Sequence, residues 1–175
     1  MALAPDSPRI PRQALLGTGI LLLLLLLQSA VVPRVFGADP DYPRPDLLLV
    51  FVLYVGVFRG GEAGATSGFW VGLLQDALSV GLFGKSAFAK CVAGFAVGGL
   101  SSSLFVEALA AQAAIAAGAT LLHNVALLTL GAVFEHQGVF RLAVLAQFFV
   151  EPVLNGLLAA VLGFFFRAVG FLREP

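Results

Sequence analysis

The chain is poor in charge and almost free of cysteine. Only 11% of its 175 residues are charged, while 59% are hydrophobic, and the mean hydropathy is +0.99. Soluble domains carry about 25% charged residues, so this composition predicts an integral membrane protein. The net charge is zero, which gives no electrostatic reason to expect a nucleic-acid partner. The single cysteine, Cys91, excludes an internal disulfide.

Motifs for catalysis and for metal binding are also lacking. The sequence holds no phosphate-cradling loop and no nucleophile, histidine and acid at a recognisable spacing. No second histidine or cysteine stands at metal-ligand spacing from His123. The connections between apolar segments are too short for a soluble catalytic domain. We therefore expect no enzymatic activity, no cofactor and no metal.

Six apolar segments follow one another along the chain. They cover residues 14–32, 46–58, 62–80, 86–105, 109–134 and 141–168, and Pro33 to Pro45 reads as a semi-rigid surface loop. The second segment is short, because about 20 residues are needed to cross the hydrocarbon core. The pattern predicts an all-α bundle of six transmembrane helices that forms one domain over residues 1–175. Arginines near both chain ends favour cytoplasmic N- and C-termini.

The third segment carries a row of small residues that ends in an acid. Gly60, Gly64, Gly68, Gly72 and Asp76 stand at every fourth position, so they lie along one face of a helix. Such a face lets another backbone come close. Two interpretations stay open: the face receives a partner's transmembrane helix, or another helix of this chain fills it.

A few polar residues interrupt the later segments. Asp76, Lys90 and Glu151 are expected in the outer half of the bundle. Two interpretations of Lys90 stay open: its ammonium extends to the interface, or it neutralises Asp76 or Glu151, because an unpaired buried charge is costly. Asn155 is expected to form an interhelical hydrogen bond, and His123 to be structural. A polar cluster of this kind suits a ligand pocket or a seat for a partner's polar residue.

Several short elements along the chain resemble one known family, that of the bacterial rod shape-determining protein MreD. The elements are Pro45-Asp46, Arg59-Gly60-Gly61, Gly72-Leu73-Leu74-Gln75-Asp76, the turn from Gly81 to Gly84, and Pro152 with Asn155. The resemblance covers most of the chain and is concentrated in residues 45–85. Lys85 departs from it, because that position is often uncharged in the family.

The resemblance implies a non-enzymatic scaffold in the bacterial inner membrane. Its partners would be an MreC-like single-span protein, membrane lipid and, in the same assembly, a RodA-like polymerase, a transpeptidase and an MreB-like filament. The faces expected to bind the partner are Gly64, Gly68, Gly72 and Asp76, with Asn155 in support. The resemblance also implies a fold similar to the substrate-binding subunits of vitamin transporters. The alternative function is therefore a small-ligand-binding transport subunit, with Asp76, Lys90, His123 and Glu151 lining its pocket.

Overall fold

Every regular element in the described part of the chain is a helix. The computed structural model describes residues 12–37, 42–79, 81–100, 108–134 and 142–168. Its elements are α1 (Arg12–Leu26), the π-helical turn η1 (Leu27–Val31), α2 (Val32–Phe36), α3 (Leu47–Arg59), α4 (Gly61–Leu78), α5 (Lys85–Leu100), α6 (Leu109–Phe134) and α7 (Leu142–Ala168). The expected all-α fold is confirmed. Some residues of the predicted segments lie outside the described residues. They are 1–11 and 169–175 of the domain, 38–41 of the predicted loop, and 80, 101–105 and 141 of the third, fourth and sixth spans.

The helices differ widely in length. Three stretches are long and apolar enough to cross a membrane: Thr18–Phe36, Leu109–Phe134 and Val144–Phe164. Helix α3 is a shorter apolar helix of 13 residues, and α4 and α5 have 18 and 16 residues. At 1.5 Å per residue these three helices measure about 20, 27 and 24 Å, which is less than a bilayer core of about 30 Å. Crossing of the membrane by α3, α4 and α5 therefore stays a prediction.

The first helical segment extends further than the sequence predicts. We expected it to end at residue 32 and a loop to begin at Pro33, but the chain continues through η1 and α2 to Phe36. Pro33 closely follows the π-helical turn η1, where the regular i→i−4 hydrogen bonding is already interrupted, and this lets the helical segment continue through the proline. The helix ends at Gly37, whose φ of 103° is readily adopted only by glycine.

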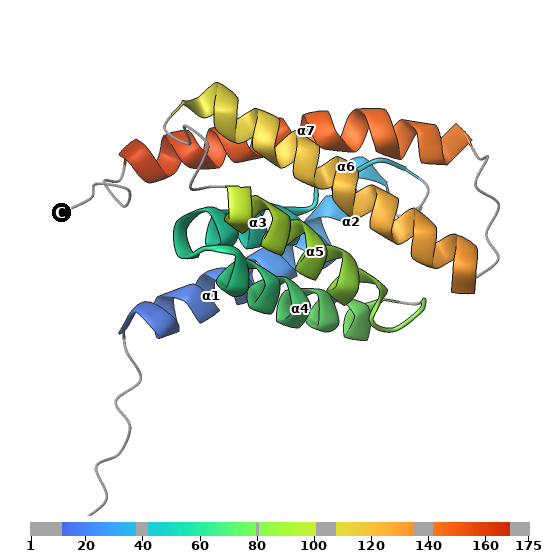
Figure 1. Cartoon of the computed structure of the whole chain (residues 1–175), viewed down its shortest axis with the longest axis horizontal. Coiled ribbons are helices and arrows are strands. Elements are labelled where there is room, and N and C mark those ends of the chain that lie inside the picture. Colours follow the sequence, from blue (N-terminus) through green and yellow to red (C-terminus); the bar gives the residue numbers. More distant parts are fainter. Residues whose placement is uncertain (1–11, 38–41, 80, 101–107, 135–141, 169–175) are drawn as a thin grey trace, which may run out of the picture.

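The segments run back and forth between the two ends of the bundle (Figure 1). Helices α4 and α5 form the most extensive pair, and α6 and α7 form the second. Helix α3 contacts both pairs and also α1. Helix α1 contributes Leu21, Leu24 and Leu25 to a small apolar cluster on α3 and α4, and is otherwise largely exposed.

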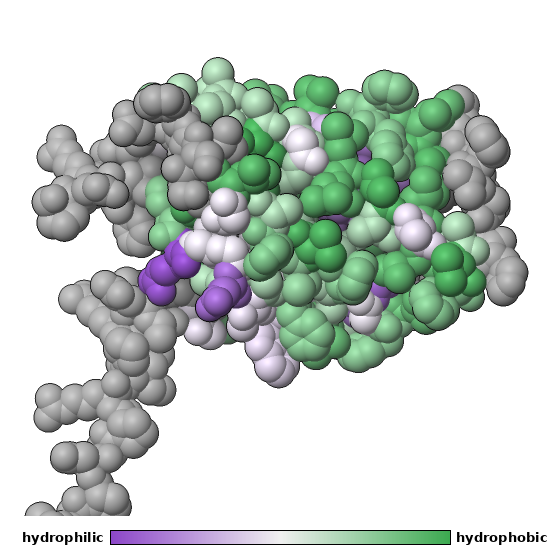
Figure 2. Space-filling view, viewed as in Figure 1, coloured by the Kyte–Doolittle hydropathy of each residue, from purple (hydrophilic) through white to green (hydrophobic). Residues whose placement is uncertain are grey.

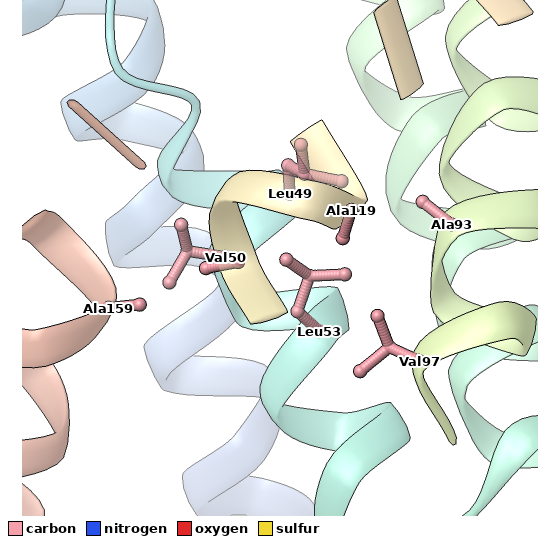
Figure 3. Packing of buried hydrophobic residues seen from close by; sticks show 8 residues of the cluster. Leu49, Val50, Leu53, Ala93, Val97, Ala119 and Ala159 are labelled. Atoms are coloured by element: carbon pink, nitrogen blue, oxygen red, sulfur yellow. The ribbon is translucent and has the colours of Figure 1, made fainter. Parts of the chain in front are cut away.

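The apolar core is built around α3. Its Leu49, Val50 and Leu53 are surrounded by small or β-branched residues of α5, α6 and α7, as Figure 3 shows for Ala93, Val97, Ala119 and Ala159. Ala116 of α6 belongs to the same cluster. Lipid is as apolar as these side chains, so close packing rather than exclusion of water holds the helices together. The alanines allow three helices to approach α3 closely, and α3 becomes the innermost element.

The outer surface is apolar. Large hydrophobic side chains of α4, α5 and α7 are exposed, among them Trp70, Phe88, Phe95, Phe149 and Phe164. Figure 2 shows that hydrophobic residues cover most of one side, with hydrophilic residues gathered at the left-hand end. A surface of this kind is expected in contact with lipid, since soluble monomers rarely expose large continuous apolar patches.

Candidate functional site

Polar side chains from η1, α5, α6 and α7 meet around the start of α3. We call this set the polar cluster: Gln28, Asp46, Lys90, Thr120, His123, Asn124, Glu151 and Asn155. Of the residues predicted as site residues, Lys90, Glu151 and Asn155 belong to it. The structure brings them together through Asp46 and its neighbours, which the sequence reasoning had not placed there.

Asp46 is the centre of the cluster and the N-cap of α3. Its Oδ1 accepts a hydrogen bond from the backbone N–H of Leu49 at 2.9 Å, and its Oδ2 forms an ion pair with Lys90. The same Oδ2 lies 4.0 Å from Nε2 of His123. Lys90 has no exposed surface, whereas 17% of the Asp46 side chain is exposed. An ammonium buried this completely is tolerated only with an opposite charge in contact, so α5 and the start of α3 are linked electrostatically.

Two amides hold the backbone that leads into α3. Oδ1 of Asn155 accepts from the N–H of Asp46 at 2.8 Å, and Oε1 of Gln28 accepts from the N–H of Leu47 at 2.9 Å. Gln28 also donates from Nε2 to the carbonyl of Pro45 at 3.4 Å. The first N–H groups of a helix have no partner inside it, and here α7 and η1 provide the partners.

The remaining members connect α6 to α7. Asn155 donates from Nδ2 to Oγ1 of Thr120 at 3.1 Å. Asn124 donates from Nδ2 to Oε2 of Glu151 at 3.1 Å, and Oε1 of Glu151 lies 3.5 Å from the donating N–H of Arg44. Each α7 member of the cluster therefore binds α6 on one side and the segment before α3 on the other.

The predicted partner of Lys90 is wrong. Lys90 pairs with Asp46, and neither Asp76 nor Glu151 forms an ion pair with it in the described structure. Asp76 stands at the end of α4 and turns its carboxylate toward the beginning of α5. There it accepts three backbone hydrogen bonds: from Gly84 at 3.0 Å, Ser86 at 3.2 Å and Ala87 at 3.2 Å. The unpaired N–H groups of a helix N-terminus attract a carboxylate. The carboxylate of Asp76 therefore binds the N–H groups at the start of α5 and not the ammonium of Lys90.

The row of glycines on α4 is filled by α5. Gly64, Gly68 and Gly72 are buried, and a Cβ built at any of them would overlap the α5 backbone, at Gly94, Lys90 and Ala87 respectively. Of the two interpretations that the sequence left open, the structure therefore shows the packing of α4 against a helix of the same chain.

A second polar contact joins α3, α6 and α7 nearer the other end of the bundle. The hydroxyl of Tyr54 donates to the carbonyl of Ala159 at 2.6 Å and lies 3.2 Å from Oε1 of Gln112. A Cβ at Gly163 would overlap these groups, so glycine at this position leaves room for the contact. Three helices are thus linked by polar bonds at two levels.

The comparison with protein families agrees with the resemblance found in the sequence. The model of the rod shape-determining protein MreD family matches residues 12–173, nearly the whole chain. The chain belongs to the MreD family. The family assignment gives this membrane protein a role in the determination of rod shape. No curated protein and no solved structure matches it significantly.

Sequence reasoning missed several members of the polar cluster, although weak signals for them are present in the chain. Pro45-Asp46 carried part of the MreD resemblance, and an acid directly before an apolar run is an N-cap signal. That signal places Asp46 at the start of α3, but it says nothing of Lys90, which is 44 residues away. For Gln28, Thr120 and Asn124, a lone polar residue within an apolar helix was the available signal.

Proposed function

We propose that this MreD-family protein is a non-catalytic scaffold of the cell-wall elongation machinery. It would bind the transmembrane helix of an MreC-like partner and help maintain rod shape. All six helical segments would lie in the inner membrane, with both termini in the cytoplasm. Family membership supports the setting. The observation that carries the scaffold proposal is that the charged groups of the polar cluster bind groups of the same chain.

The geometry of the cluster favours a structural role over a ligand pocket. A pocket needs polar groups that converge on an open space. Here the ammonium of Lys90 is fully buried against Asp46, and Asn155 uses both ends of its amide to join α7 to α3 and α6. These bonds fix the rotation of the helices and their relative positions along the bundle axis. A scaffold requires such a rigid structure.

The partner needs a face other than the glycine row, because α5 fills that row. Helix α6 exposes a second line of small residues at four-residue spacing: Ala110, Ala114 and Gly118. A Cβ at Gly118 would meet no atom within 4 Å. Small residues permit the close backbone approach that stabilises helix pairs in lipid, so we propose that the partner helix packs on this face.

The experiment is co-purification of the tagged protein with its MreC-like partner in mild detergent, comparing Gly118→Leu with wild type. The variant is expected to fold, because the added side chain enters open space, and to lose the partner by steric exclusion. Gly99→Leu on α5 is the matched control, since Gly99 also has open space around its Cβ position and lies on another helix. Full retention of the partner by Gly118→Leu would show that the α6 face is not the binding face.

The same purification separates the two kinds of function. Mass spectrometry of the wild-type sample would identify a single-span partner, and with it any RodA-like polymerase, transpeptidase or MreB-like filament in the assembly. A bound small metabolite without a protein partner would refute the scaffold proposal and favour a transport subunit.

A further inference from the structure

We propose that the turn between α4 and α5 lies inside the bilayer and presents Leu82 and Phe83 to lipid. We call Ser79 and residues 81–84 the α4–α5 turn. The inference rests on the membrane placement of α4 proposed above, and it adds a lipid-binding surface and a role for Asp76.

Helix length places the turn below the membrane surface. Arg59 and Glu62 are both exposed at the junction of α3 and α4, which sets that end of α4 at the aqueous interface. From Glu62 to Leu78 the helix rises about 24 Å, whereas the hydrocarbon core is about 30 Å thick. Any tilt of α4 shortens this rise further. The turn that follows Leu78 is therefore reached before the opposite surface of the core.

The composition and exposure of the turn suit lipid. Residues 77–84 contain no Asp, Glu, Lys or Arg. Leu78 is 65% exposed, Leu82 36% and Phe83 63%. They continue the exposed apolar side of α4 that includes Trp70 and Leu74. The apolar surface of α4 thus continues into the turn without a charged residue. Such a surface suits contact with lipid.

Several backbone groups of the turn and of the start of α5 are bound from within the protein. Backbone groups at membrane depth have no water to bind, so irregular backbone there needs internal partners. The carboxylate of Asp76 accepts from the N–H groups of Gly84, Ser86 and Ala87, and Asp76 is only 7% exposed. In addition, Lys85 donates from its N–H to the carbonyl of Leu82 at 3.3 Å.

Gly84 and Lys85 complete the turn. Gly84 has a φ of 93°, which glycine adopts without steric cost and which lets the chain reverse direction tightly. Lys85 follows immediately, and its long side chain can carry the ammonium toward the interface while its stem stays among apolar groups. Asp76 thus provides the hydrogen-bond acceptor for backbone N–H groups that a chain reversal inside the hydrocarbon core would otherwise leave without partners.

Tryptophan fluorescence can measure the depth of the turn. Trp70 is the single tryptophan, so Trp70→Phe provides a background without fluorescence from indole. Phe83→Trp in that background places one indole on the turn, at an exposed position that accepts it without repacking. Glu62→Trp in the same background serves as the aqueous control, and the wild-type protein, with Trp70 halfway along α4, serves as the lipid control.

The proteins are reconstituted into phosphatidylcholine vesicles with brominated acyl chains and, separately, titrated with iodide in unbrominated vesicles. The indole at position 83 is expected to be quenched by bromine as Trp70 is. Iodide is expected to quench it much less than it quenches the indole at position 62. Iodide quenching at position 83 equal to that at position 62, without bromine quenching, would place the turn in water and overturn the proposal. Absence of bromine quenching at Trp70 itself would refute the membrane placement of α4 along with it.

Discussion

Breaking the ion pair between Asp46 and Lys90 by removing one of its charges is expected to be among the most destabilising single substitutions in this chain. Asp46→Asn keeps the cap oxygen for the N–H of Leu49 but leaves the ammonium of Lys90 buried without a counter-charge. Removing one partner of a buried pair costs about 3–5 kcal/mol. Lys90→Met is expected near the lower end of this range, because the Asp46 side chain is 17% exposed and water can reach it.

The double variant separates the pair from other effects of the two substitutions. With both charges gone, the expected cost is about 1 kcal/mol, the loss of one ordinary hydrogen bond. The interaction energy from the four proteins is the two single costs together less the cost of the double variant, and should therefore be about 5–7 kcal/mol. At about 2–4 °C of Tm per kcal/mol, each single variant should lower Tm by about 6–20 °C.

The measurement is thermal unfolding in detergent, followed by circular dichroism and by the reaction of Cys91 with a thiol-reactive dye. Cys91 is the single cysteine and is half-buried, so it becomes fully reactive on unfolding. A second cycle, of Lys90→Met with Asp76→Asn, is the control, because Asp76 binds backbone groups rather than Lys90. Additive effects of the substitutions at Asp46 and Lys90, or a larger interaction energy with Asp76, would refute the reasoning.

Two further predictions concern packing and hydrogen bonding. Gly68→Ala is expected to cost about 1–3 kcal/mol, because its Cβ would overlap the α5 backbone, whereas Gly118→Ala on the open face of α6 should leave Tm unchanged or slightly raise it. Equal effects of the two in the same unfolding assay would contradict the tight α4–α5 contact. Asn155→Ala should cost about 1–3 kcal/mol, since the buried N–H of Asp46 loses its acceptor, and Thr129→Ala at an exposed site should stay within about 0.5 kcal/mol. An Asn155→Ala variant as stable as Thr129→Ala would show that the hydrogen bonds of Asn155 do not stabilise the protein.

The helices could largely be predicted because their limits are local properties of the chain. The run from 109 to 134 is uniformly apolar, and the predicted and observed limits of α6 agree. The end of the first segment could not be predicted, because Pro33 normally marks a boundary. Whether it stops a helix depends on the preceding turn, which here is the π-helical η1.

The candidate site could be predicted only in part. Spacing along a helix shows which residues share a face, and on that basis Lys90, Glu151 and Asn155 were expected to be polar groups inside the bundle. The structure places these three residues in the polar cluster. Spacing does not show which faces of two helices meet. The choice of Asp46 rather than Asp76 as partner of Lys90 depends on the rotation of α5 relative to α3, which the packing of many side chains decides.

The bonds at the start of α3 have a consequence for the order in which the protein is assembled. Helix α3 is synthesised well before α7, but the N–H of Asp46 finds its acceptor on α7. Until Asn155 arrives, the second segment carries an unsatisfied backbone group and an acid whose counter-charge comes from α5. Before α7 is synthesised, the polar cluster therefore lacks Glu151 and Asn155, which bind the segment before α3 and α6. A chain interrupted before α7 would leave the N–H of Asp46 and the amide of Asn124 without these partners.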